Sequence, residues 1–99
     1  MGKFKLGKMV TTKGVYEVMA SSVEFRKFVA NCLARHLRGD WGDVVGIDRQ
    51  ENELALKDGF RLMSVYKFMD AKGEKKAWKV WVITEADRSV TTVLFPSEY

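Results

Sequence analysis

The sequence predicts an α+β fold in a single domain, residues 1–99, with an N-terminal strand and helices packed on a three- to four-stranded antiparallel sheet. Three observations predict this fold. The first half of the chain spaces its apolar residues as a helix does, and the second half contains three runs rich in β-branched and aromatic residues. Short polar segments separate those runs, as in a C-terminal β-meander. Helices that precede an antiparallel sheet are typical of α+β proteins.

The first predicted element is a short strand, because apolar and polar residues alternate over residues 4–10. Thr12 is placed to cap a brief helix that follows the strand. Ser21 and Glu24 have the spacing of a capping box, in which Ser21 accepts from the backbone and Glu24 reaches back. A longer helix is therefore expected over residues 22–38.

The helix at residues 22–38 carries an apolar stripe that we expect to face the sheet. The stripe consists of Phe25, Phe28, Val29, Cys32, Leu33 and Leu37. Gly39 is placed to end this helix as a left-handed residue. If Leu33 is buried as predicted, Leu33→Ala is expected to cost about 2–5 kcal/mol of stability.

A third, short helix is predicted to begin at Asp48, with Glu51 completing a second capping arrangement, and to end at Gly59. Asn52 lies on this helix, and its amide must be paired if it is buried. The backbone of the turn at residues 40–43 is its expected partner.

The remainder of the chain predicts three strands, at residues 60–69, 77–84 and 89–95. The connections at residues 70–73 and 85–88 are short enough for antiparallel hairpins.

The composition is that of a globular chain, with 46% hydrophobic and 30% charged residues and a net charge of +4. No apolar run approaches the roughly 20 residues of a membrane span, and residues 1–5 do not resemble a signal peptide. We therefore expect a cytoplasmic protein without membrane association. Cys32 is the only cysteine, which excludes an internal disulfide and a thiolate metal cluster. We expect no metal and no cofactor, and either a monomer or a weak homodimer.

Basic residues are concentrated at the N-terminus, where Lys3, Lys5, Lys8 and Lys13 precede any acidic residue. Such an arm is suited to the phosphates of RNA or DNA. Lysines also protect the exposed edge of a sheet from pairing with other chains, and we favour this second interpretation.

Two predicted turns carry more polar groups than a chain reversal needs. In the first, Asp40 and Asp43 flank Trp41 between two glycines, which fits either a tight reversal with Trp41 as a lid on the core or a ligand-binding loop. In the second, Glu85, Asp87 and Arg88 form either a solvated ion pair or a site in which a carboxylate orients Arg88 toward a phosphate or a partner's carboxylate. We expect the two turns to lie within hydrogen-bonding reach of each other or to share one cleft.

His36, the only histidine, falls within the apolar stripe one turn before the predicted end of its helix. The favoured interpretation is a hydrogen-bonded core histidine. The alternative is a general acid or base that Asp40 or Asp43 orients.

Trp78 and Trp81 are predicted to point to opposite faces of their strand, because they are three residues apart. One is expected in the core. The other, beside Lys79, is expected to be an interface anchor or a surface on which a base stacks. The sequence does not decide which tryptophan is exposed.

Three segments, RHLRGDWGD, NELALKDGFRLMSVYKF and KVWVITEADRSVTTVLFPSEY, resemble a family of small bacterial proteins that are often found on plasmids, phages and other mobile elements. The resemblance covers about residues 4–99, and its GDWG and WVITEADRS pieces are specific. An insertion around residues 70–76 departs from the family pattern. The matching residues are His36, Gly39, Asp40, Trp41, Gly42, Asp43, Asn52, Ala55, Leu56, Gly59, Arg61, Ser64, Tyr66, Trp81, Ile83, Thr84, Glu85, Ala86, Asp87, Arg88, Ser89, Thr91, Pro96, Glu98 and Tyr99.

The family carries no assigned activity, so the resemblance implies an association with mobile elements and no reaction. The preferred hypothesis is a non-catalytic accessory or anti-defence protein that binds a host protein or a nucleoprotein complex. Its contact residues are expected to be Asp40, Trp41, Asp43, Trp78, Lys79, Asp87 and Arg88.

The order of elements is also similar to that of barnase-like and toxin-type ribonucleases, which cleave RNA without a metal. That similarity implies an alternative function as an RNA-cleaving enzyme. His36 and Glu85 would supply the acid and the base, Arg88 would stabilise the phosphorane, and Thr91 would be an auxiliary donor.

Overall fold

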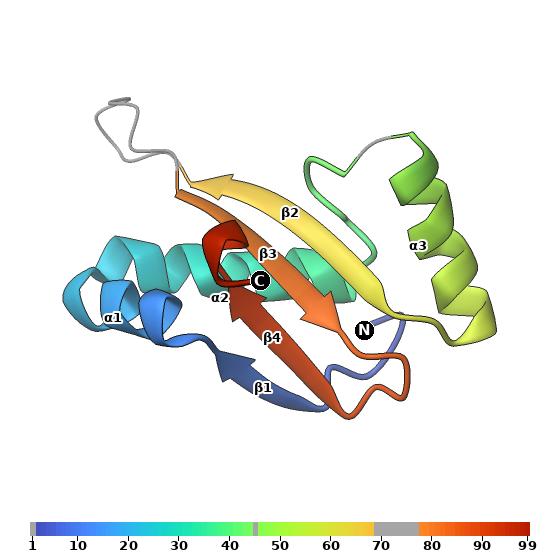
Figure 1. The fold of residues 1–99 in the computed structure, drawn as a ribbon, viewed down its shortest axis with the longest axis horizontal. Coiled ribbons are helices and arrows are strands. Elements are labelled where there is room, and N and C mark those ends of the chain that lie inside the picture. Colours follow the sequence, from blue (N-terminus) through green and yellow to red (C-terminus); the bar gives the residue numbers. More distant parts are fainter. Residues whose placement is uncertain (1, 45, 69–77) are drawn as a thin grey trace.

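The computed structural model describes residues 2–44, 46–68 and 78–99 and confirms an α+β fold (Figure 1). The elements in chain order are β1 (Lys8–Thr11), α1 (Lys13–Ser21), α2 (Val23–Leu37), α3 (Ile47–Asp58), β2 (Leu62–Phe68), β3 (Trp78–Thr84), β4 (Val90–Leu94) and a final 3₁₀ turn, η1 (Pro96–Glu98). The predicted connection at residues 70–73 lies outside the described residues.

The four strands form one sheet in the order β1-β4-β3-β2. β2, β3 and β4 are the predicted antiparallel meander, but β1 runs parallel to β4, with Lys8 opposite Val90 and Thr11 opposite Val93. The sheet is therefore mixed, and the prediction of a purely antiparallel sheet was wrong. Local alternation identifies a strand but not its direction relative to a partner far along the chain, and the crossover through the helices sets that direction. As an edge strand, β1 has the place that its lysines predict.

α1 and α2 cover one face of the sheet, and α2 crosses behind the strands (Figure 1). Its residues Phe25, Val29 and Cys32 are buried against side chains of β2, β3 and β4. His36 continues this line and is also fully buried. Leu33 is only partly buried at the margin of the core, so Leu33→Ala should cost less than the predicted range.

Helix α2 begins and ends with complete caps. The N-cap is Ser22, one residue later than predicted, and its Oγ accepts a hydrogen bond from the amide of Phe25 at 3.1 Å. At the other end Gly39 has φ +80°, as predicted, and the amide of Asp40 donates to the carbonyl of Arg35 at 2.9 Å. This 6→1 bond defines a Schellman motif and fixes where the chain leaves the helix.

Thr12 is the N-cap residue of α1, as predicted, whereas the predicted start of α3 at Asp48 was wrong. Thr12 does not cap α1 through its side chain; its hydroxyl donates to Glu98, whose carboxylate also accepts the amide of Gly14 at 2.9 Å. The side-chain carboxylate of Glu98 thus caps the N-terminus of α1, where the helix dipole favours a negative charge. α3 begins at Ile47 after Gly46, without a side-chain cap, rather than at Asp48.

α3 lies beside the edge of β2 rather than on the helical face of the sheet (Figure 1). The amide of Asn52 donates to the carbonyl of Met63 at 2.7 Å and accepts from its N–H at 3.2 Å. Asn52 is therefore paired with β2 and not, as predicted, with the 40–43 turn. The backbone groups of Val65, two residues further along the same edge of β2, are paired with main chain. The N–H of Val65 donates to the carbonyl of Trp41, and the carbonyl of Val65 accepts the amide of Asp43. Side chain and loop together seal an edge that would otherwise expose unpaired backbone groups.

Gly42 is required where the 41–43 segment pairs with β2. Its φ is +70°, and a Cβ there would lie 2.0 Å from the carbonyl oxygen of Val65. Gly59, at the end of α3, has φ +78° but no atom within 4 Å of such a Cβ. The two glycines share a left-handed conformation and differ in the space around them.

This difference predicts unequal effects of alanine at the two positions. Gly59→Ala should cost about 1–2 kcal/mol, the usual penalty of a left-handed residue. Gly42→Ala should cost at least about 2 kcal/mol more, because β2 and the 41–43 segment must also separate. Urea unfolding of both variants measures the difference, and equal costs would show that the close approach at Gly42 is not required.

Candidate functional site

A chain of buried hydrogen bonds connects α2 to three strands and the N-terminal arm. His36 Nδ1 lies 2.5 Å from Ser64 Oγ, and His36 Nε2 lies 2.9 Å from Thr84 Oγ1. Thr84 Oγ1 lies 2.7 Å from Thr91 Oγ1, which donates to the carbonyl of Leu6 at 2.7 Å. The four side chains are all 0% exposed.

The end of this chain determines the proton positions along it. The carbonyl of Leu6 only accepts, so the hydroxyl proton of Thr91 points to it and Thr91 must accept from Thr84. Thr84 then accepts from the N–H at Nε2 of His36. In the neutral ring, which burial favours, Nδ1 has no proton and accepts the hydroxyl proton of Ser64. A neutral imidazole with its proton on Nε2 therefore satisfies every member of the chain.

Burial, with a smaller contribution from the positive charge of Arg88, lowers the pKa of His36 from 6.5 to about 4. The predicted core role of His36 agrees with this environment. A side chain that is 0% exposed has no access to substrate, and a base with this pKa is uncharged at neutral pH.

Arg88 is held by main-chain oxygens rather than by a carboxylate. Its guanidinium donates to the carbonyl of Phe60 at 2.6 Å and to that of Ala55 at 3.0 Å. Longer bonds reach the carbonyls of Glu85 and Ala86. These contacts join the C-terminal turn of α3, the connection between α3 and β2, and the β3–β4 turn. Arg88 also has φ +60°, so it occupies the left-handed position that glycine usually fills in a hairpin.

The other two charged residues of the 85–88 turn have separate partners. Glu85 lies 3.8 Å from Arg61, and Asp87 accepts the amide of Ser89 at 2.9 Å. Hydrogen bonds from Ser89 lower the pKa of Asp87. Neither carboxylate orients Arg88, so the predicted pairing of Arg88 with a neighbouring carboxylate was wrong.

The 40–43 turn is a structural reversal with a buried tryptophan. Arg35 donates two hydrogen bonds to Asp40, at 2.7 and 3.2 Å, and holds the pKa of that carboxyl below its usual range. Trp41 is 1% exposed and donates to Glu53 at 3.1 Å. Trp41 is therefore the predicted lid on the core, and it is not available as a surface contact.

Within the described residues, no hydrogen bond joins the two charged turns, and the groove described below is lined by Asp43 of the first turn and by no residue of the second. Phe4 lies between them: its ring is 6.4 Å from that of Trp41 and 5.7 Å from the guanidinium of Arg88. The expectation that the two turns lie within hydrogen-bonding reach of each other was wrong, because the ring of Phe4 lies between them.

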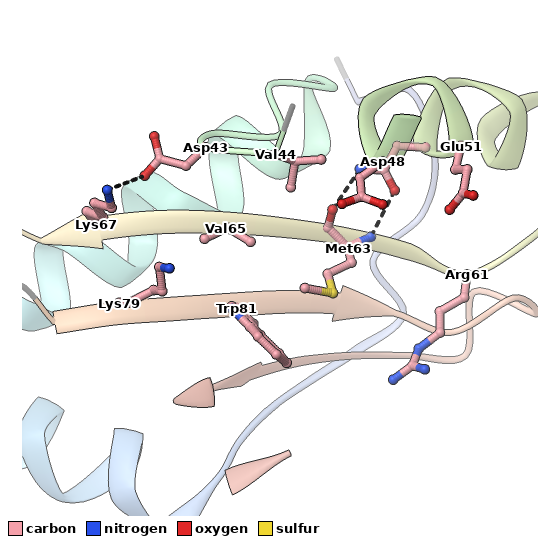
Figure 2. Close-up of a pocket in the computed structure, with 11 residues that line it drawn as sticks. Asp43, Val44, Asp48, Glu51, Arg61, Met63, Val65, Lys67, Lys79 and Trp81 are labelled. Atoms are coloured by element: carbon pink, nitrogen blue, oxygen red, sulfur yellow. Dashed lines mark hydrogen bonds and ion pairs between the residues drawn. The ribbon is translucent and has the colours of Figure 1, made fainter. Parts of the chain in front are cut away.

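A groove of about 570 Å³ lies on the sheet face opposite α2 (Figure 2). β2 and β3 form its base, and the loop after residue 42 and the first turns of α3 form one side. Its lining residues are Asp43, Val44, Asp48, Glu51, Asn52, Arg61, Met63, Val65, Lys67, Lys79 and Trp81.

The two sides of the groove have opposite charge. Figure 2 shows Asp43, Asp48 and Glu51 on the loop and helix side, Lys67 on β2, Lys79 on β3 and Arg61 just before β2. Lys67 approaches Asp43 at 4.0 Å between exposed side chains, a geometry that contributes about 0–1 kcal/mol. The groove is thus a dipolar surface that is open to solvent.

Of the predicted contact residues whose side chains the structure describes, Asp43 and Lys79 line this groove and the others do not. Sequence reasoning missed the carboxylates of α3 and the cations Arg61 and Lys67. Alternation along residues 61–67 was the available signal, since it places Arg61 and Lys67 on the same face of β2. The side chain of Trp78 lies outside the described part of the chain, whereas Trp81 is partly buried in the base of the groove.

Comparisons with protein-family models, curated proteins and solved structures found no match for this chain. Within residues 2–44, 46–68 and 78–99, no helix has the length and apolar character needed to cross a membrane. The same residues contain no group of three or more His, Cys, Asp or Glu side chains arranged to hold a metal ion.

The buried histidine predicts a specific pH dependence of stability. The pKa of His36 is about 4 in the folded chain, against an ordinary value of 6.5, so the unfolded chain binds its proton more readily. The free energy of unfolding should therefore be highest above pH 6.5. It should decrease by about 3 kcal/mol in all as the pH falls through 4. Urea unfolding at several pH values in this window measures the loss. His36→Gln should remove most of this slope; an unchanged slope would assign it to other groups.

The hydrogen bonds from Arg88 to main-chain carbonyls, which we call the Arg88 clamp, predict that even a lysine at this position destabilises the fold. Arg88→Lys should lower the free energy of unfolding by about 1.5–3 kcal/mol, because one ammonium cannot reach carbonyls on three elements. Arg26→Lys on the exposed side of α2 is the matched control and should change stability by less than about 0.5 kcal/mol. Equal effects, measured by chemical denaturation, would mean that the clamp contributes nothing.

Proposed function

We propose that this chain is a non-catalytic binding protein, an accessory or anti-defence protein of a mobile genetic element that acts on a host protein or nucleoprotein complex. One observation carries the binding part of the proposal: the dipolar groove is open, whereas the groups suited to catalysis are occupied within the fold. The association with mobile elements rests on the sequence resemblance.

The geometry gives no support to the alternative of RNA cleavage. That mechanism requires a histidine that exchanges protons with substrate and an arginine that is free to meet a phosphate. His36 is 0% exposed, and the guanidinium of Arg88 donates to main-chain carbonyls. Thr91, the auxiliary donor in that scheme, is likewise 0% exposed and donates to Leu6.

A protein surface suits the groove better than a nucleic acid does. Asp43, Asp48 and Glu51 would place negative charge against phosphates along one whole side. The lysine-rich N-terminal arm leads into β1, at the opposite edge of the sheet from β2, and so it does not extend the basic side of the groove.

The proposal predicts specific capture of a partner and no cleavage of RNA. Tagged wild-type protein should retain a discrete protein or nucleoprotein complex from a bacterial lysate, and Lys79→Glu should lose it, because the reversal changes the charge of the groove. Lys27→Glu on the exposed side of α2 has the same charge change and should behave as wild type. Structured and single-stranded RNA, incubated with wild type and a chelator, should stay intact.

RNA cleavage by the wild type that disappears in folded His36→Ala would overturn the proposal in favour of the enzyme. Circular dichroism of the variant verifies that it is folded. If wild type, Lys79→Glu and Lys27→Glu capture the partner equally, the binding surface lies outside the groove.

A further inference from the structure

The two edges of the sheet differ in how their backbone groups are paired. The edge at β2 is sealed by Asn52 and by the 41–43 segment. The opposite edge is β1, the outermost strand in the order β1-β4-β3-β2. β1 forms the lower border of the sheet in Figure 1, and no other segment of the described chain runs along its outer side. Among the described residues, β1 is therefore an open edge.

Two residues of β1 direct their backbone groups away from the sheet. The amide of Lys8 donates to the carbonyl of Ser89 at 3.0 Å, and that of Thr12 donates to a carbonyl of β4 at 3.1 Å. Because the backbone groups of successive residues in a strand point to alternate edges, those of Met9 and Thr11 point outward. No described residue bonds to these outward groups, and both side chains are exposed, that of Met9 by 58%.

Lysines surround this open edge. Lys5 and Lys8 are exposed, and neither forms an ion pair with a described residue. Lys13 approaches Glu17 at 3.9 Å between exposed side chains, so its charge also remains solvated. The carboxylate of Glu98, near the end of β1, already accepts hydrogen bonds at the N-terminus of α1. The charge along the edge thus favours an acidic strand over a neutral or a basic one.

The same lysines oppose pairing between two copies of this chain. Two β1 strands side by side would bring Lys5, Lys8 and Lys13 of one copy close to the same residues of the other. Lysines on an edge strand protect it by this repulsion. The repulsion does not act on an acidic strand, so the edge is closed to its own copies and open to an acidic partner.

We propose that β1 is a second binding surface, which takes an extended acidic segment of a partner protein as an added strand of the sheet. The outward N–H and C=O groups of Met9 and Thr11 repeat every two residues, about 6.6–6.8 Å, and an extended backbone supplies donors and acceptors with this repeat. Acidic side chains of the segment lie beside Lys8. This surface is separate from the groove, and the proposal does not depend on it.

Other ligands leave part of the edge unpaired. The backbone groups of a helix are bonded within the helix and cannot pair with a strand. The phosphates of a nucleic acid can accept from the amides of Met9 and Thr11, but they cannot donate to the carbonyls of these residues. An extended polypeptide is therefore the ligand class that satisfies the whole edge.

The test compares three capped heptapeptides. In the first, glutamate alternates with valine; in the second, lysine replaces glutamate; the third is the acidic peptide with its central backbone amides N-methylated, which keeps the charge and removes the donors. Titrated into ¹⁵N-labelled full-length protein at low ionic strength, the acidic peptide should shift the backbone signals of Met9 and Thr11. It should also slow hydrogen exchange of these two amides, because pairing protects them. The Kd of the lysine peptide and of the N-methylated peptide should each be at least about ten-fold higher.

Variants of β1 locate the contact. Met9→Pro removes an outward N–H without breaking a bond to β4, a position at which edge strands accept proline, and it should weaken binding of the acidic peptide by at least about ten-fold. Lys8→Glu should weaken it by about five- to ten-fold, and Lys27→Glu, the same charge change on the exposed side of α2, should leave it unchanged. Circular dichroism verifies that each variant is folded. Should Met9→Pro not fold, Lys8→Glu and the N-methylated peptide decide the question.

Three results would overturn the proposal. Equal affinity for the acidic peptide and its N-methylated form would show that charge alone attracts the peptide and that no strand is added. Shifts confined to groove residues such as Lys79 and Trp81 would place the contact in the groove. A dimer of the free protein, seen by light scattering, that Met9→Pro converts to a monomer would assign the edge to a second copy of the chain.

Discussion

The fold depends on a buried histidine that must remain uncharged. His36 sits where α2 crosses the sheet, and its two ring nitrogens bond to Ser64 on β2 and Thr84 on β3. Thr91 on β4 and the carbonyl of Leu6 complete the chain. One hydrogen-bonded path thus joins the helix layer, three strands and the N-terminal arm. In the low-dielectric interior such hydrogen bonds are stronger, and a buried polar group without a partner is costly. The path therefore favours the one arrangement of the helix, the strands and the arm in which every polar group is paired.

The same constraint explains why polar residues suited to catalysis are engaged in structure. Each buried polar group needs a partner, and the chain has few residues with which to supply them. Arg88 bonds to carbonyls at the end of α3, before the start of β2 and in the β3–β4 turn, three places where regular secondary structure stops. Cys32 is similarly removed from chemistry, because burial raises the pKa of its thiol to about 12.

Sealing the edge of β2 also creates the groove. Asn52 and the 41–43 segment bond to β2 at Met63 and Val65, and this pairing places α3 beside the strand rather than over it. The outer face of β2 and β3 is left uncovered between α3 and the C-terminal turn (Figure 1). The acidic residues that line this space come from the loop after residue 42 and from α3, and the basic ones are Arg61, Lys67 on β2 and Lys79 on β3.

The sequence by itself determined the element types, the line of buried residues on α2 and the left-handed ends at Gly39 and Gly59, because spacing and turn chemistry act over a few residues. It also predicted that His36 and Trp41 are core residues, although the sequence left a functional role open for each of them. Only the tertiary structure decided the parallel pairing of β1, the partner of Asn52, the carbonyl clamp on Arg88 and the separation of the two charged turns by Phe4. These features depend on contacts between residues far apart in the chain, and local patterns carry no information about which distant backbone group a polar side chain will meet.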